Sequence, residues 1–241
     1  SVTETLRCDY YIDGSYNQTF YNPNGTPTIN TINGFTEGQH NWYVQCIDSS
    51  FYDIISPTYY FNVSFDPLLT LIDPQPQSWH NTTDVTIYYK PDDNNATLDW
   101  CDLYVDGVFN YSERPNSGAI SSYTIPGLSE GFHTWYWQCQ DWDANQVNSS
   151  TWNFTVDLTP PITSLITPAD GELFNVSTVL FNITGTDSMS SNLTCEINLD
   201  GTIVTTQNIL NNSYMDYTQN SMDDGIHFWN ATCYDLSGNS H

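Results

Sequence analysis

The chain has 241 residues, a length that allows one large domain or two to three small ones. Its 28 acidic residues outnumber three basic ones, and the formal net charge of −25 argues against binding to nucleic acid or to anionic lipid headgroups. No apolar run reaches the length of about 18 residues that a membrane-spanning helix needs. Aromatic and β-branched residues are plentiful and no stretch has helical periodicity, so the sequence predicts an all-β protein.

Six cysteines mark an internal repeat. They form three pairs whose members lie 38 positions apart: Cys8 and Cys46, Cys101 and Cys139, Cys195 and Cys233. Similar words surround each pair: CDYYIDG, CDLYVDG and CEINLDG at the first cysteine, and EGQHNWYVQCID, EGFHTWYWQCQD and DGIHFWNATCYD at the second. The pairs recur at intervals of about 93 residues, which we take as the length of the repeat.

The repeat divides the chain into three parts. Residues 67–157 form a complete second repeat, whereas residues 1–66 correspond to a first repeat whose early strands are missing. Residues 158–241 correspond to a third repeat that lacks its last strand. The linkers FDPLL and VDLTPPI contain prolines, which stiffen the joints between repeats.

Within the second repeat, seven short segments read as strands: 68–72, 85–89, 98–105, 108–111, 122–125, 132–140 and 150–156. A tight-turn signal, Asp-Gly, separates the third segment from the fourth and recurs in the other repeats at 13–14 and 200–201. Seven short strands in about ninety residues are typical of an immunoglobulin-like or fibronectin-III-like sandwich. The expected fold is therefore a tandem array of antiparallel β-sandwiches with one disulfide per repeat.

Alternation along the strands predicts which cysteines pair. The inward faces comprise Cys101, Leu103 and Val105 of the third strand and His133, Trp135, Trp137 and Cys139 of the sixth. Opposed residues of an antiparallel pair have position numbers with a constant sum, and Cys101 with Cys139 gives the same sum as Gly107 with His133. Because the other repeats behave alike, we predict three bonds, each joining neighbouring strands of one sheet. In antibody domains the bridge instead crosses between sheets.

One repeated set of residues resembles a known family. The pattern of Leu128, Gly131, His133, Trp135, Cys139 and Asp141, completed by a Gly-Asn turn in the third repeat, is similar to that of Ig-like repeats in prokaryotic, particularly archaeal, surface proteins. The resemblance covers essentially the whole chain. It implies a stalk, an adhesin or an envelope component, and it marks a fold rather than a binding site.

Three histidines, His40, His133 and His227, occupy one repeat position. Metal binding would need convergent ligands, so we favour a structural corner in which the ring bonds to backbone, similar to the tyrosine corner of sandwiches. Neither a zinc-type CxxC spacing nor a catalytic motif is present, and we expect neither enzymatic activity nor a cofactor. Calcium at the joints stays an open alternative because aspartates cluster at 92–93, 141 with 143, and 223–224.

N-glycosylation is the strongest chemical signal. Thirteen of the 25 asparagines begin an Asn-x-Ser/Thr sequon: Asn17, Asn24, Asn62, Asn81, Asn95, Asn110, Asn148, Asn153, Asn175, Asn182, Asn192, Asn211 and Asn230. Asn17 and Asn110 are expected at equivalent repeat positions, as are Asn62 and Asn153. The sequence thus predicts a surface protein that carries covalent N-glycans, which shield strand edges.

The preferred function is a structural component of an extracellular, glycosylated surface assembly: a filament, stalk or surface layer. Its expected partners are neighbouring repeats or other copies of the chain, with strand exchange completing the partial repeats. Three disulfides imply an oxidising compartment unless the source is a hyperthermophile, so we expect the chain outside the cell or at its surface. Two alternatives stay open. Trp79, Trp142 and Trp152 lie outside the repeated words and fit an adhesin or carbohydrate-binding module. The repeats also fit accessory domains of a larger secreted enzyme.

Overall fold

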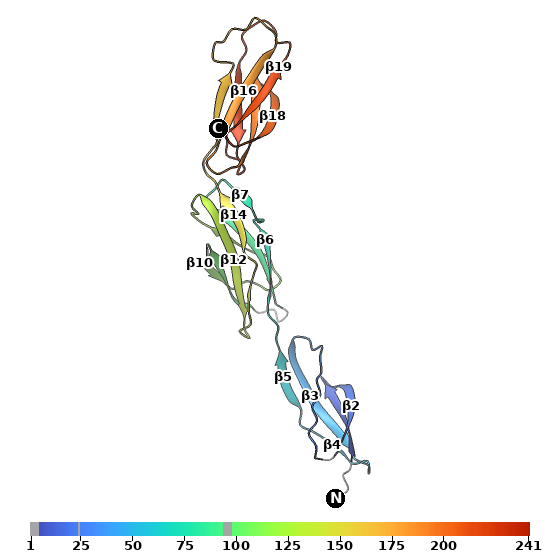
Figure 1. Ribbon diagram of the computed structural model, residues 1–241. Coiled ribbons are helices and arrows are strands. Elements are labelled where there is room, and N and C mark those ends of the chain that lie inside the picture. Colours follow the sequence, from blue (N-terminus) through green and yellow to red (C-terminus); the bar gives the residue numbers. More distant parts are fainter. Residues whose placement is uncertain (1–4, 24, 94–97) are drawn as a thin grey trace.

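The computed structural model describes residues 5–23, 25–93 and 98–241. The three repeats lie end to end (Figure 1), and every element of the described residues is a β-strand. Within those residues, no helix is long and apolar enough to cross a membrane. The predicted fold class, tandem antiparallel β-sandwiches with one disulfide per repeat, is confirmed.

The second repeat is a two-sheet sandwich. One sheet has the order β10 (Val108–Glu113), β9 (Leu98–Val105), β12 (Gly131–Asp141), β14 (Trp152–Val156) and β7 (Ser78–His80), and β13 (Gln146–Asn148) also pairs with β12. The other has the order β11 (Ser121–Ile125), β8 (Val85–Asp92) and β6 (Leu68–Asp73). Both sheets place alternate apolar side chains between them, as the period of two requires.

Large aromatic side chains fill the centre of this sandwich. Trp135, Trp137 and Phe154 are fully buried, and Tyr89 from the opposite sheet stacks on Trp137 with ring centroids 3.9 Å apart. The strict alternation of buried and half-buried residues along β12 explains why the sequence located this strand correctly. Two strands were missed, β7 and β13, because each has three residues and no apolar alternation of its own.

The third repeat has two three-stranded sheets. One has the order β15 (Ile162–Thr167), β16 (Val179–Thr186) and β19 (Ser213–Gln219), and the other the order β18 (Thr202–Leu210), β17 (Asn192–Leu199) and β20 (Trp229–Tyr234). Phe181, Ile183 and Met215 from the first sheet meet Leu193 and Ile197 from the second in one buried cluster. The core is smaller than that of the second repeat, and β20 forms an edge of its sheet.

The first repeat has a single sheet in the described residues. Its strands are β1 (Thr5–Ile12), β2 (Ser15–Pro23), β3 (Gly38–Ile47), β4 (Asp53–Ile55) and β5 (Tyr59–Val63). Tyr10 and Trp42 are only half-buried, whereas their second-repeat counterparts, Leu103 and Trp135, are fully buried. The segment 28–32 corresponds to β11 but forms no strand, since no counterpart of β8 pairs with it among the described residues.

Candidate functional site

The disulfides lie on strand pairs of one sheet. Cys101 of β9 is directly opposite Cys139 of β12, and the two Cα atoms are 4.1 Å apart. The same register places Cys8 opposite Cys46 and Cys195 opposite Cys233, with Cα separations of 4.0 Å. Every bond therefore stays within its repeat. The closed loop of 38 residues stabilises each repeat by about 4 kcal/mol in the chain-entropy model.

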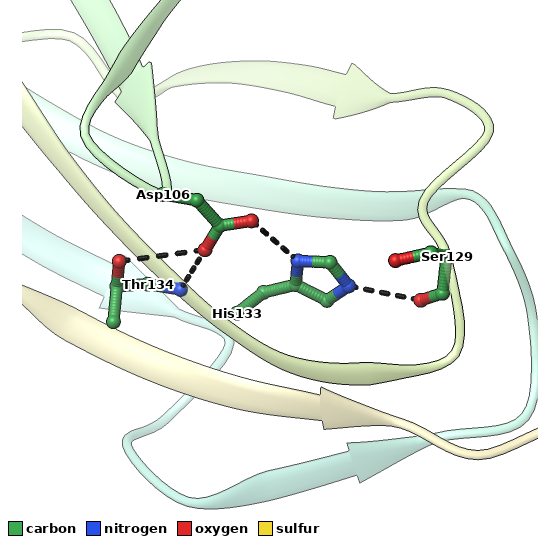
Figure 2. Close-up of polar contacts among 4 residues, drawn as sticks. All are labelled: Asp106, Ser129, His133 and Thr134. Carbon is green, nitrogen blue, oxygen red and sulfur yellow. Dashed lines mark hydrogen bonds and ion pairs between the residues drawn. The ribbon is translucent and has the colours of Figure 1, made fainter.

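An aspartate–histidine corner joins the turn after β9 to the start of β12 (Figure 2). His133 Nδ1 donates to Asp106 Oδ2 at 2.7 Å, and Nε2 donates to the backbone oxygen of Ser129 at 2.9 Å. Asp106 Oδ1 accepts from the backbone N–H of Thr134 at 2.8 Å. Asp106 and Gly107 both have positive φ, 52° and 76°, as the two central residues of a type I′ turn must.

The same corner recurs in the other two repeats. His40 donates to Asp13 at 2.6 Å and to the Thr36 carbonyl at 2.7 Å. His227 donates to Asp200 at 2.7 Å and to the Asp223 carbonyl at 3.0 Å. Each ring thus has the backbone bond that the sequence predicted and an aspartate that it did not.

Two of the corners also shift the acidity of their members. The aspartate hydrogen bond, followed by the backbone bond, raises the pKa of His40 and of His227. The reciprocal bond lowers the pKa of Asp13 and of Asp200. Because both acceptors favour the doubly protonated ring, the corner stabilises that form and fixes the turn. Its geometry favours a structural role rather than a metal site.

The sequon asparagines differ in accessibility. Eight are exposed: Asn17, Asn62, Asn81, Asn110, Asn148, Asn175, Asn192 and Asn230. Asn153, Asn182 and Asn211 are half-buried, and Asn24 and Asn95 lie outside the described residues. The amide nitrogen that would carry a sugar is already engaged in Asn182, which donates to Asp216, and in Asn211, which donates to the Asp187 carbonyl.

One expected equivalence between sequons is wrong. Asn17 and Asn110 do occupy the same place, since each is the residue skipped at the register shift of its hairpin. Asn62, however, is opposite Gln39, whereas Asn153 is opposite Thr134, so the counterpart of Asn153 is Tyr60. The two asparagines are therefore offset by two positions. Asn62 and Asn153 are 91 positions apart, whereas the paired strands of the two repeats correspond at an offset of 93 positions.

Each joint between repeats is held from both sides. At the first, Glu37 accepts from the Phe65 N–H at 3.3 Å, and Asn145 of the second repeat donates to the Ser64 hydroxyl at 2.8 Å and to the Phe65 carbonyl at 3.3 Å. Asp141 orients that asparagine by accepting from its backbone and side-chain nitrogens, each at 2.8 Å. The linker backbone is thus bound by one residue of each repeat.

The second joint repeats this arrangement. Glu130 accepts from the Leu158 N–H at 3.2 Å, and Asn239 of the third repeat donates to the Asp157 carbonyl at 2.8 Å. Asp235 orients Asn239 as Asp141 orients its counterpart. We call each set of glutamate, linker and asparagine a joint clamp. Sequence reasoning recognised the Gly-Asn turn but not that its asparagine reaches across the joint.

The predicted aspartate clusters are not the place where the structure brings carboxylates together in metal-ligand geometry. Asp93 and Asp141, members of two predicted aspartate clusters, lie on the second repeat near the first joint and are buried. The cluster with metal-ligand geometry is instead made by Asp157, Asp187 and Asp235 at the second joint. Asp223, from the third predicted cluster, bonds to His227 through its carbonyl. None of these three residues belongs to a predicted cluster, because they are distant from one another in sequence.

The three tryptophans considered for carbohydrate binding have different environments. Trp142 is exposed, and the Arg114 guanidinium lies 5.4 Å from the centre of its ring. Trp79 and Trp152 are half-buried, and Trp152 packs edge-on against Trp135. Of the three, only Trp142 is exposed.

Comparison with known proteins gives a likeness of fold. No protein-family model matches the chain, and no curated protein sequence matches it. Among solved structures it is similar to the fibronectin(III)-like modules of Clostridium thermocellum CbhA, with 14% identity over 72% of this chain and 88% of that one and a TM-score of 0.48. It is also similar to a 1.5-MDa bacterial ice-binding adhesin, with 16% identity over 100% of this chain and 84% of that one and a TM-score of 0.38. A third similar structure is that of the FN1–FN3 domains of chicken CNTN1, with 7% identity over 98% of this chain and 85% of that one and a TM-score of 0.42.

Proposed function

We propose that this chain is a non-catalytic spacer in an extracellular, glycosylated surface assembly: a stalk, a filament or a surface layer. The observation that supports this most strongly is the joint clamp, which recurs at both joints with the same residue types. A repeat array with unconstrained linkers bends freely at each joint. An array whose linker backbone is hydrogen-bonded to both neighbours keeps its repeats in one relative orientation, and that is the property a spacer needs.

The covalent chemistry supports an extracellular setting. Three disulfides persist in oxidising compartments and are rare in the cytosol of mesophiles. Eight sequon asparagines are exposed, so sugars could be attached to them without disturbing the folded repeats. Negative charge and glycans together keep such a surface soluble and deter edge-to-edge pairing of strands.

Electron microscopy of the purified chain tests the spacer proposal. Class averages of the unaltered protein should show one end-to-end arrangement of three repeats. Asn145→Ala should broaden the angle at the first joint only, and Asn239→Ala the angle at the second only, because each removes one side of a clamp. Gln146→Ala, which changes the exposed neighbour of Asn145, is the matched control and should change neither. A broad range of angles in the unaltered protein would refute the proposal.

A second candidate, a carbohydrate-binding adhesin, rests on the exposed ring of Trp142 and the adjacent Arg114. Sugar rings stack on such open aromatic faces. A glycan array tests this candidate directly. Binding that disappears in Trp142→Ala would favour it over a passive spacer, whereas an array without hits would remove it. Strand exchange between copies stays a prediction.

A further inference from the structure

Three carboxylates converge at the second joint. Asp157 follows β14 at the end of the second repeat, Asp187 follows β16 and Asp235 follows β20, both in the third repeat. One oxygen of each lies within 4.8 Å of the others. The cluster therefore contains residues of both repeats that meet at this joint.

The cluster is largely shielded from water. Asp157 is fully buried, Asp235 is 8% exposed and Asp187 is half-buried. Asp187 Oδ1 accepts from the backbone N–H groups of Met189 and Ser190, at 2.7 and 2.6 Å. Its other oxygen, Oδ2, is buried and has no hydrogen-bond partner among the described residues. A buried, unpartnered carboxylate oxygen is costly unless a cation or a proton compensates it.

The chain does not supply that cation. Its three basic side chains all form ion pairs elsewhere: Arg7 with Asp9, Lys90 with Asp92 and Arg114 with Asp99.

We propose that the second joint binds a calcium ion through Asp157, Asp187 and Asp235. Calcium prefers carboxylate and other oxygen ligands at about 2.3–2.6 Å, so two of its ligands can lie up to about 4.6–5.2 Å apart. Oxygens that lie within 4.8 Å of one another are compatible with this range. Magnesium demands near-ideal octahedral geometry and gives up its water reluctantly, so we expect it to bind three carboxylates less tightly. Water completes the coordination shell.

The first joint serves as a comparison within the same chain. Ser64 stands at the position of Asp157, because Val63 and Val156 occupy equivalent places opposite Gly38 and Gly131. The described part of that joint consequently has one carboxylate fewer. We therefore expect a single calcium ion per chain, and we expect it to stabilise the joint between the second and third repeats.

Calorimetric titration of the chelator-treated chain with calcium chloride tests the site. The unaltered protein should bind one ion with a dissociation constant on the order of 10⁻⁴–10⁻³ M, as extracellular calcium modules do. Asp187→Asn should weaken binding at least about tenfold, since loss of an outer-shell partner alone costs about 10–100-fold. This variant keeps an Oδ1 that can accept from Met189 and Ser190, so the fold should survive. Asp143→Asn, an exposed change of equal charge, should leave binding unchanged.

Thermal denaturation separates loss of the site from loss of the fold. Without calcium, Asp187→Asn should melt no lower than the unaltered protein, because one of three repelling charges is gone. With calcium, only the unaltered protein and Asp143→Asn should melt at a higher temperature. The proposal is overturned if the unaltered protein shows no saturable binding up to about 10 mM calcium. It is equally overturned if Asp187→Asn binds as well as the unaltered protein, or if magnesium binds as tightly as calcium. None of these results would bear on the joint clamps.

Discussion

Gly185 of β16 packs over the disulfide of the third repeat. A Cβ atom added there would lie 2.7 Å from Leu193 Cδ1 and 3.0 Å from Cys233 Sγ. The leucine methyl can rotate away, but the sulfur is held by its bond to Cys195. Overpacking of this kind costs about 1–3 kcal/mol, whereas replacing glycine by alanine recovers about 0.4–1 kcal/mol from the unfolded chain. Gly185→Ala should therefore lower the free energy of unfolding by about 1–2 kcal/mol.

Differential scanning calorimetry measures this effect. For a unit of this size, a loss of about 1–2 kcal/mol lowers the melting temperature by roughly 4–16 °C. Leu180→Ala changes an exposed residue of the same strand, and we expect it to cost less than about 1 kcal/mol. The reasoning would be refuted if Gly185→Ala melted at the wild-type temperature, since the two sheets would then not be in close contact over the disulfide.

The corner and the sequons give two further predictions. The raised pKa of His227 adds stability that is complete below the unfolded-state pKa of about 6.5 and is lost as pH rises through the folded-state pKa. The lowered pKa of Asp200 adds stability that is lost only as pH falls below the unfolded-state pKa of about 3.8. NMR titration should therefore give His227 a higher pKa in the unaltered protein than in the Asp200→Asn variant; equal pKa values would contradict the ion pair. Glycopeptide mass spectrometry should find sugar on Asn110, which is exposed, and none on Asn211, whose side-chain amide donates a hydrogen bond to the Asp187 carbonyl. The reverse pattern would contradict the assignment from exposure.

Features that repeat in the sequence were predictable, because local spacing determines them. The constant sum of positions fixed the register of β9 and β12, and it follows from antiparallel geometry alone. The Asp-Gly word predicted the turn at Asp106, since only residues that tolerate positive φ fit there. The partner of His133 was also within reach of sequence reasoning, because an aspartate precedes each corner histidine by 27 positions.

Features that depend on contact between distant segments were not predictable. The pairing of β7 with β14 is parallel and joins residues far apart in the chain. Neither strand has a sequence pattern that identifies the other as its partner. The cluster of Asp157, Asp187 and Asp235 forms only when two repeats meet, so clustering along the sequence pointed to other aspartates. Burial of an inward-facing residue also depends on the opposite sheet, as Trp42 and Trp135 illustrate.

Peptide mapping of the protein isolated from its source, under non-reducing conditions, tests the central claim of an extracellular array of disulfide-bonded repeats. The account predicts three linked peptide pairs, Cys8 with Cys46, Cys101 with Cys139 and Cys195 with Cys233, and no free thiol. Reduced cysteines in the native protein, or a bond between two repeats, would contradict it.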